Sequence, residues 1–336
     1  MLHGIDVHTH IVPEHFPAAL GRHADVPWPS MQHYCDQQGC GHAHVMIRGK
    51  NYRTVPAASW DVDIRRQDMD AMQLQRQALS PMPELLSYWL PLEDAQVMCR
   101  HLNETIANMI SRAPDRFSGL GAIPLQDPQA AIRELEYLMG PLGLSGVQIA
   151  SNINDVSIGD ARFDDFFAAA ERLGAAVFVH ALRPAGKQRL VGVPQLEQVV
   201  AFPGDIGLAL ASMITGGMLE RHPALRIGFS HGGGAFAMML PRIEHGWRTA
   251  APIRDSIPQS PATYARRVYA DSLVYDPHAL RAVIRTFGEQ HVMIGSDYPF
   301  VVRDKDPHGS IAAIDPDSAL ALALREGNAK AFLGLG

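Results

Sequence analysis

Short apolar runs recur along the chain, and each is followed by a polar or glycine break and then by a segment with apolar residues three and four positions apart. Near-continuous apolar runs are typical of strands in a parallel sheet that is covered on both faces. Spacings of three and four indicate amphipathic helices. We therefore predict strands over residues 4–10, 76–82, 117–124, 146–150, 175–180, 226–231, 268–274 and 291–297. The predicted helices cover residues 61–74, 93–112, 128–140, 162–173, 207–221, 234–248, 277–287 and 317–333.

The alternation of eight strands with eight helices predicts an α/β fold, a (β/α)8 TIM barrel formed by residues 1–336 as one domain. The segment DPQAAIRELEYLMG (127–140) begins with an aspartate and ends with a glycine, as a helix should. A doubly wound sheet is the alternative. It is less favoured because no glycine-rich phosphate-binding fingerprint follows the first strand.

Residues 13–60 interrupt the alternation directly after the first predicted strand. A hairpin is expected around HAHVMIRGKNYRTV (42–55), with its tight turn at Gly49-Lys50. An insertion that follows a barrel strand is expected over the C-terminal face, where barrel enzymes hold their active sites. Three further loops are predicted over 183–204, 249–264 and 300–316.

Charge and cysteine content exclude some functions. The chain of 336 residues carries a net charge of −6, which argues against a general nucleic-acid-binding protein. Its three cysteines are too few and too odd in number for a disulfide framework, so a reducing compartment is favoured. The N-terminus shows no basic region followed by an apolar one, and no apolar run looks long enough to span a bilayer. We expect a cytoplasmic enzyme that binds no membrane.

Histidines and one aspartate end several predicted strands: His8, His10, His180, His231 and Asp297. His8 and His10 are two residues apart, so both rings point to one face of their strand. In a barrel, all five groups meet at one rim. Imidazoles with a carboxylate suit a divalent, zinc-like ion. A lone histidine would more often be a structural residue, but five groups at four strand ends favour a metal site.

The ordered set IDVHTHIVPEHF, VFVHA, FSHGGGAF and GSDYPF resembles the amidohydrolase superfamily, and within it the aminocarboxymuconate-semialdehyde decarboxylase-like family. The resemblance extends over nearly the whole chain. It implies one Zn²⁺ or other divalent ion per chain, with His8, His10, His180 and Asp297 as ligands. It implies that His231 is a general acid/base rather than a permanent ligand. The run GVQIA (146–150) has no lysine, which argues against the binuclear hydrolases of the superfamily.

The same resemblance implies residues that bind the substrate. Arg53 in the insertion and Arg242 after His231 match arginines that bind carboxylates, a task that suits the planar guanidinium. Phe300, at the end of GSDYPF, is assigned to substrate binding as well. Arg242 lies 11 residues beyond His231. At a rise of about 1.5 Å per residue that is about 16 Å along a helix, so we expect a homodimer in which Arg242 serves the partner's site.

The chain departs from the family after the fifth strand. Ala181-Leu182 stands where the family has Pro-Trp, and Gln188-Arg189 replaces a later Pro-Trp pair. Compared with the family, this chain therefore lacks two aromatic residues that would line the site, and it has the cations Arg183, Lys187 and Arg189 nearby instead. This departure bears on the substrate and leaves the metal centre intact. A solvated loop is the alternative interpretation of these three cations.

The function predicted from these residues is a metal-dependent, non-oxidative decarboxylase (a carboxy-lyase) of a small unsaturated or aromatic acid, with 2-amino-3-carboxymuconate 6-semialdehyde or a close analogue as substrate. A hydrolase of a lactone or amide is the competing enzyme, because the same ligands could activate water. A metal-holding scaffold without catalysis is the alternative outside enzymes. A second zinc site at Cys35, Cys40, His42 and His44 is not favoured, because C-x4-C-x-H-x-H is not a common zinc spacing.

Overall fold

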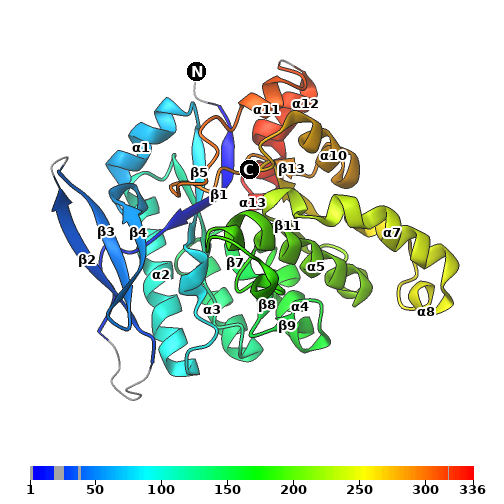
Figure 1. Cartoon of the computed structure of the whole chain (residues 1–336), viewed down its shortest axis with the longest axis horizontal. Helices are drawn as coiled ribbons and strands as arrows, with labels where there is room; N and C mark the ends of the chain where they lie inside the picture. Colours follow the sequence, from blue (N-terminus) through cyan, green and yellow to red (C-terminus); the bar gives the residue numbers. More distant parts are fainter. Residues whose placement is uncertain (1–2, 19–25, 37–38, 317) are drawn as a thin grey trace.

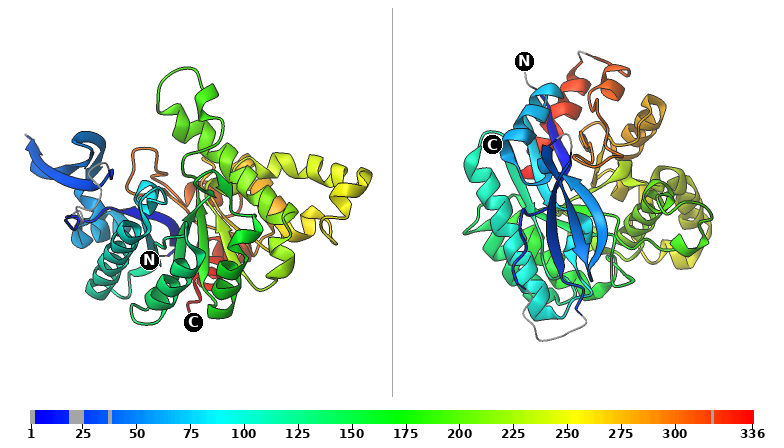
Figure 2. Two further views of the ribbon diagram at one scale, coloured as in Figure 1. Left: turned by 90° about the horizontal axis from the view of Figure 1, so that it is seen from below. Right: turned by 60° about the vertical axis from the view of Figure 1, so that its left-hand side comes forward.

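The computed structural model describes residues 3–18, 26–36, 39–316 and 318–336. Eight parallel strands form one sheet in the order β1-β5-β6-β7-β10-β11-β12-β13, with helices packed around it (Figures 1 and 2). The predicted (β/α)8 barrel is confirmed. The barrel strands are β1 (Ile5–Ile11), β5 (Arg76–Pro81), β6 (Phe117–Gly121), β7 (Gly146–Ala150), β10 (Ala176–His180), β11 (Arg226–Phe229), β12 (Tyr269–Asp271) and β13 (Val292–Met293).

The barrel closes between its first strand and the residues that follow its last strand. Two isolated parallel bridges join Asp6 to Ile294 and Thr9 to Tyr298. The backbone N–H of Asp297 also donates to the carbonyl oxygen of His8 at 2.9 Å. Residues 294–298 therefore continue beside β1 after β13 has ended, and Asp297 is brought next to the histidines of the first strand.

Thirteen α-helices lie in the described part of the chain: α1 (Val62–Ala71), α2 (Leu92–Arg112), α3 (Pro128–Met139), α4 (Asp164–Leu173), α5 (Phe202–Thr215), α6 (Met218–Arg221), α7 (Phe236–Thr249), α8 (Ala251–Arg254), α9 (Pro261–Ala265), α10 (Pro277–Phe287), α11 (Gly309–Ala312), α12 (Ala319–Leu322) and α13 (Asn328–Leu333). Short 3-10 or π-helical turns are η1 (Ala57–Ser59), η2 (Pro83–Leu86), η3 (Ala161–Phe163), η4 (Lys187–Arg189), η5 (Glu197–Ala201), η6 (His231–Gly233) and η7 (Ala323–Gly327). A small hairpin, β8 (Asn152–Ile153) with β9 (Val156–Ser157), follows β7.

Two predicted helices differ from the observed ones. The helix predicted over 207–221 begins earlier, at Phe202, because a proline is tolerated in the first helical turn. It is also divided into α5 and α6 at Gly217, whose φ of 72° favours glycine. The helix predicted over 317–333 is interrupted by η7, and residue 317 itself lies outside the described residues.

The last two barrel strands are shorter than the runs predicted over 268–274 and 291–297. β12 ends at Asp271, whose carboxylate accepts the backbone N–H of Leu273 at 3.1 Å. Such a local side-chain bond competes with the strand ladder. At the end of the second run, Asp297 has a φ of 62°, which a regular strand does not allow. The regular strands therefore end before the predicted runs do, although residues 294–298 still lie beside β1.

The insertion after β1 is a three-stranded antiparallel sheet of β2 (Pro29–Asp36), β3 (Gly39–Ile47) and β4 (Lys50–Pro56). It stands beside α1 and α2 at the edge of the molecule (Figures 1 and 2). The predicted hairpin is present, but its turn lies one residue earlier than predicted, at Arg48-Gly49, because Ile47 pairs with Lys50. Both turn residues have positive φ, at 52° and 71°, as a two-residue hairpin turn requires. Buried Val45 and Val55 pack this sheet against the main core.

The segment Glu197–Thr215 is long and apolar enough to cross a membrane by length and composition alone, contrary to the prediction that no run would be. Core helices of globular proteins have the same length and composition. Of the apolar window, 44% is buried inside the molecule, where α5 packs against α7.

Candidate metal centre

Four side chains meet at the carboxyl end of the barrel: His8, His10, His180 and Asp297. One ligand atom from each lies within 4.8 Å of the other three. All four residues are buried, and Asp297 is the most exposed of them at 7%. β1 supplies two of these residues, β10 supplies one at its last position, and the segment after β13 supplies the aspartate.

Each of these imidazoles is held through its Nδ1 atom. His8 Nδ1 donates to Asp271 Oδ2 at 2.7 Å, and His10 Nδ1 donates to the Pro81 carbonyl oxygen at 3.1 Å. His180 Nδ1 donates to the Ala181 carbonyl oxygen at 2.8 Å. This pattern leaves a lone pair on every Nε2 atom, as metal-binding histidines require.

The atoms of these side chains that face the centre of the cluster form no hydrogen bonds. The Nε2 atoms of all three histidines and Oδ1 of Asp297 are buried without a hydrogen bond, although His10 Nε2 and Asp297 Oδ1 lie only 3.0 Å apart. Buried polar atoms are nearly always paired, so four orphaned atoms that face one another call for an explanation. A divalent ion at this point would satisfy all four, so the donor set fits a metal.

Electrostatic effects favour ligand-competent protonation states in this cluster. Burial lowers the pKa of His10, and it lowers the pKa of His180 well below the usual value. Burial opposes ionisation of Asp297, but the neighbouring imidazoles, His10 first, hold the pKa of that carboxyl below its usual range. His8 differs: burial acts against its charged form, yet the hydrogen bond to Asp271 raises its pKa.

His231 lies beside this cluster but outside it. Its ring centroid is 5.3 Å from that of His8 and 5.1 Å from that of His180. Its Nδ1 is 3.0 Å from Ser230 Oγ, and burial lowers its pKa to about 4. Its φ of 56° is in the left-handed region, a strained conformation for a residue with a side chain. The ring is thus held next to the four candidate ligands without completing their set.

A cavity of about 480 Å³, here called the inner chamber, opens over these residues. His180, His231, Asp297, Arg53 and Phe300 line it. The guanidinium of Arg53 lies 4.7 Å from the centroid of the Phe300 ring, and its Nη2 donates to Glu84 Oε1 at 2.8 Å. Phe300 also stacks on the His10 ring, with 5.1 Å between centroids. A guanidinium and an aromatic ring therefore line the chamber beside the candidate metal position.

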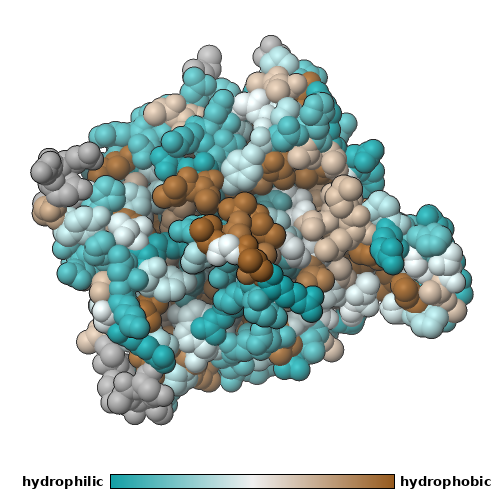
Figure 3. Space-filling view, viewed as in Figure 1, coloured by the Kyte–Doolittle hydropathy of each residue, from teal (hydrophilic) through white to brown (hydrophobic). Residues whose placement is uncertain are grey.

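The mouth of the inner chamber is apolar. Val199 and Val302 line the cavity and are 61% and 37% exposed. Figure 3 shows apolar side chains gathered in the middle of this face of the molecule. An apolar rim with a few convergent polar groups is typical of small-molecule sites.

The family model for amidohydrolases matches residues 5–335. The chain belongs to the amidohydrolase family. The 2-amino-3-carboxymuconate-6-semialdehyde decarboxylase of Dictyostelium discoideum is 37% identical over 335 residues, which cover 98% of this chain and 91% of the relative.

Solved structures of other amidohydrolase-type enzymes share the fold. The 5-carboxyvanillate decarboxylase of Sphingomonas paucimobilis superposes with a TM-score of 0.77 at 22% identity, covering 100% of both chains. That of Novosphingobium aromaticivorans, complexed with manganese and a nitrobenzoic acid, gives a TM-score of 0.74 at 24% identity over 83% of this chain and 82% of the other. The likeness shows that this amidohydrolase shares their fold.

Sequence reasoning missed Asp271 in this amidohydrolase. One carboxylate oxygen accepts from His8 Nδ1 and from the backbone N–H of His231 at 3.0 Å, and the other accepts from the backbone N–H of Gly232 at 2.7 Å. Asp271 thus orients one candidate ligand and fixes the turn that carries His231. The sequence did contain a signal for Asp271, because it is a carboxylate near the end of the seventh strand. Asp297 was singled out for the equivalent reason, at the end of the eighth predicted strand.

Arg242 does not join the site within this chain. It is exposed on α7 and does not line the inner chamber among the described residues. Helices α7 and α8 project from the rest of the molecule (Figures 1 and 2). The assignment of Arg242 to a partner's site stays a prediction.

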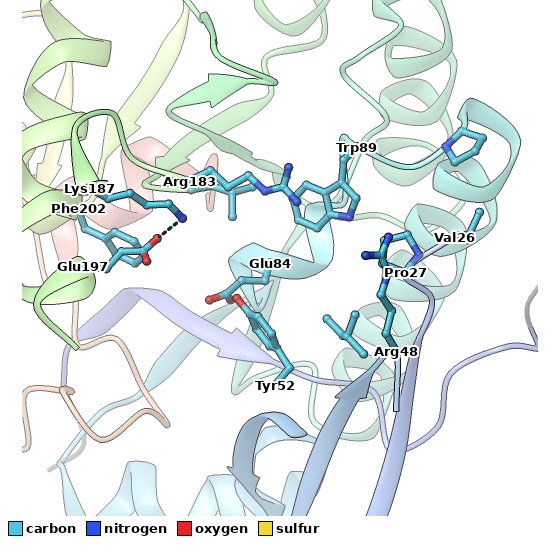
Figure 4. Close-up of a pocket in the computed structure, with 13 residues that line it drawn as sticks. Val26, Pro27, Arg48, Tyr52, Glu84, Trp89, Arg183, Lys187, Glu197 and Phe202 are labelled. Carbon is cyan, nitrogen blue, oxygen red and sulfur yellow. Dashed lines mark hydrogen bonds and ion pairs between the residues drawn. The ribbon is translucent and has the colours of Figure 1, made fainter. Parts of the chain in front are cut away.

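The three cations gained after β10 have different positions. Arg183 and Lys187 line a second cavity of about 820 Å³, here called the outer chamber, whereas Arg189 is exposed on the same loop and is not part of that lining (Figure 4). Glu84 and Phe202 line both chambers, so the two cavities adjoin.

The disfavoured cysteine–histidine set lies partly outside the described residues, because the side chain of Cys40 is not among them. Cys35 is disulfide-bonded. The rings of His42 and His44 stack on Tyr34, and His44 Nδ1 is 2.9 Å from Thr54 Oγ1.

Proposed function

We propose that this amidohydrolase is a metal-dependent, non-oxidative decarboxylase of a small unsaturated or aromatic acid. The observation that carries the proposal is the set of four orphaned ligand atoms next to a cavity that His180, Asp297 and Arg53 line. A relative 37% identical over nearly the whole chain bears the name of such an enzyme. The metal ligands are His8, His10, His180 and Asp297, and His231 is the acid/base.

The finer assignments are zinc as the ion and 2-amino-3-carboxymuconate 6-semialdehyde, or a close analogue, as the substrate. Three imidazoles with one carboxylate form a donor set that zinc accepts. Manganese is the competing ion, as it occurs in a structural neighbour. The substrate follows the name of the relative in Dictyostelium discoideum.

In this proposal, several residues of the chain have separate roles in decarboxylation. When bound, the divalent ion supplies Lewis-acid chemistry. Arg53 holds a carboxylate so that its C–C bond lines up with the π-system of the substrate, a positioning effect. As that bond breaks, CO2 leaves and the electron pair stays on the carbon. His231, placed beside the ligands and neutral because burial lowers its pKa, takes up a proton from water and passes it to that carbon, where it replaces CO2. Phe300 packs against the ring or the conjugated chain of the substrate.

We also propose a homodimer in which Arg242 acts on the partner's site. The support is its position on the projecting helix α7, where Met238 is 82% exposed. Mixing His231→Ala and Arg242→Ala dimers tests this, because a mixed dimer regains one complete site. About half the dimers are mixed after random exchange, so about a quarter of wild-type activity should return. Activity that stays at the parental level, despite demonstrated exchange, would contradict the assignment.

The domain arrangement and location are proposals of the same kind. The insertion over 13–60 covers the catalytic end of a single domain, and the enzyme works in the cytoplasm. Limited proteolysis and cell fractionation, respectively, check these two statements.

Product analysis is the decisive test of the function. The metal-loaded protein should release CO2 from a panel of muconate semialdehydes and hydroxybenzoic acids. The matched variant His278→Ala changes an exposed histidine outside the site and should keep that activity. Ring opening without CO2 would favour a lactone or amide hydrolase. Metal binding without turnover of any acid, lactone or amide would favour a scaffold.

A further inference from the structure

The outer chamber is built from three segments that follow different barrel strands. Tyr52 comes from the insertion after β1, Trp89 follows η2 after β5, and Arg183 lies on the loop after β10 (Figure 4). Loops after barrel strands commonly determine what a barrel enzyme binds. The chamber is larger than the inner one, at about 820 Å³ against about 480 Å³. It is therefore large enough to hold part of a ligand and is more than a passage through which CO2 leaves.

Arg183 is the distinctive cation of this chamber. Its guanidinium lies 3.5 Å from the centroid of the Trp89 ring, a close cation–π contact. Its φ of 48° is in the left-handed region, which is strained for an arginine. The indole covers one face of the guanidinium and holds the plane, which leaves the N–H donors at its edges for a ligand.

Arg183 also lacks the carboxylate partner that neighbouring cations have. Lys187 Nζ is 3.1 Å from Glu197 Oε1, and Arg53 is paired with Glu84. Within the described part of the chain, no carboxylate forms an ion pair with Arg183 within 4.0 Å. Three cations (Arg48, Arg183 and Lys187) and two carboxylates (Glu84 and Glu197) line the chamber.

We infer that the outer chamber is a subsite for a second carboxylate of the substrate, bound by Arg183 on its Trp89 platform. This inference rests on the proposed function, because the first carboxylate must occupy the inner chamber. The substrate class is then an unsaturated or aromatic acid with an extension that passes Glu84 and Phe202 and ends in an anionic group. An acid without that extension binds the inner chamber alone.

Matched ligand pairs test the inference. The probes are 2,6-dihydroxybenzoates with a C4 side chain of one to four methylenes, ending in either a carboxylate or its primary amide. Calorimetry on the metal-loaded protein measures affinity, and CO2 release is followed separately. For at least one chain length, the acid should bind about ten- to hundred-fold more tightly than the amide, the effect of a hydrogen bond to a charged group.

Variants assign that preference to Arg183. Arg183→Met should reduce the acid-to-amide ratio to about one and leave the affinity of the amide unchanged. Arg189→Met removes an exposed cation on the same loop and should preserve the ratio. Arg183→Lys, a point charge without the planar fork, should restore only part of it. A ratio that persists in Arg183→Met overturns the inference.

A wild-type measurement covers the case in which Arg183→Met does not fold. Added salt should weaken binding of the acid more than binding of the amide, because both probes carry the benzoate carboxylate and only the acid carries a second one. A wild-type ratio near one at every chain length overturns the inference, even if the unextended benzoate releases CO2 and the proposed function stands. A preference that depends on Arg183, without CO2 from any probe, keeps the subsite and contradicts decarboxylation of this substrate class.

Discussion

The inner and outer chambers adjoin, yet they are built in different ways. In the inner chamber the candidate ligands are at most 7% exposed, and each imidazole is held by a carboxylate or a backbone carbonyl. In the outer chamber the cations come from loops, and the side chain of Lys187 is 46% exposed. Strands and buried hydrogen bonds therefore fix the geometry that chemistry needs, while loops provide groups that can change with the substrate.

Removal of an inner ligand should have the largest effect. His8→Ala should abolish metal binding and activity, because it removes one of four buried ligands and leaves Asp271 without its imidazole partner. Elemental analysis measures the loss, with His278→Ala as the control for an exposed histidine. Full metal occupancy in His8→Ala would remove the basis for the proposed site.

His231→Ala separates chemistry from metal binding. We expect normal metal content and a loss of turnover of about 10²- to 10⁴-fold, the usual contribution of a positioned acid/base. His180→Ala is the reference, because it should lose the metal. If His231→Ala loses metal to the same extent, His231 is a ligand and its proposed role is wrong.

Asp271→Asn should have an intermediate effect. An asparagine can keep the bond to the Gly232 N–H but presents an amide N–H toward His8 Nδ1, which disfavours the required tautomer. Metal affinity should fall by about 10- to 100-fold, as measured by competition with a chelator. The control is Asp276→Asn, since asparagine also caps helices well and Asp276 caps α10. Equal affinities in the two variants would show that Asp271 does not orient the ligand.

Gly49→Ala should have the smallest effect, and on stability alone. The glycine has a φ of 71°, and a Cβ atom there meets nothing within 4 Å, so the change tests backbone strain only. We expect a loss of about 1 to 2 kcal/mol in the free energy of unfolding, measured by denaturant titration. Gly41→Ala, in the same sheet and equally uncrowded, has no positive φ and should not show this loss. A clear fall in turnover of Gly49→Ala would show that the insertion controls the inner chamber.

Much of the inner site could be predicted because it follows from local rules. His8 and His10 share a face through the period of a strand, and parallel strands bring His180 and Asp297 to the same rim. Asp271 was missed because its role depends on its pairing with a ring from β1, 263 positions away in the chain.

The outer chamber could be predicted only in part for the same reason. The sequence indicated the new cations, but nothing in it placed Arg183 on Trp89, 94 residues earlier, or paired Lys187 with Glu197.

The hairpin turn was misplaced by one residue, because register is set by cross-strand pairing and not by the glycine alone.

The way in which the barrel closes links metal binding to the stability of the fold. β1 and β5 pair along a ladder, whereas β1 meets residues 294–298 at two isolated bridges and through backbone hydrogen bonds such as the one from Asp297 N–H to the His8 carbonyl oxygen. His8 and His10 stand on one side of this seam and Asp297 on the other. An ion bound by all three would tie the two sides of this seam together, so part of its binding free energy becomes folding free energy. We therefore expect removal of the metal to speed amide hydrogen exchange in residues 292–298.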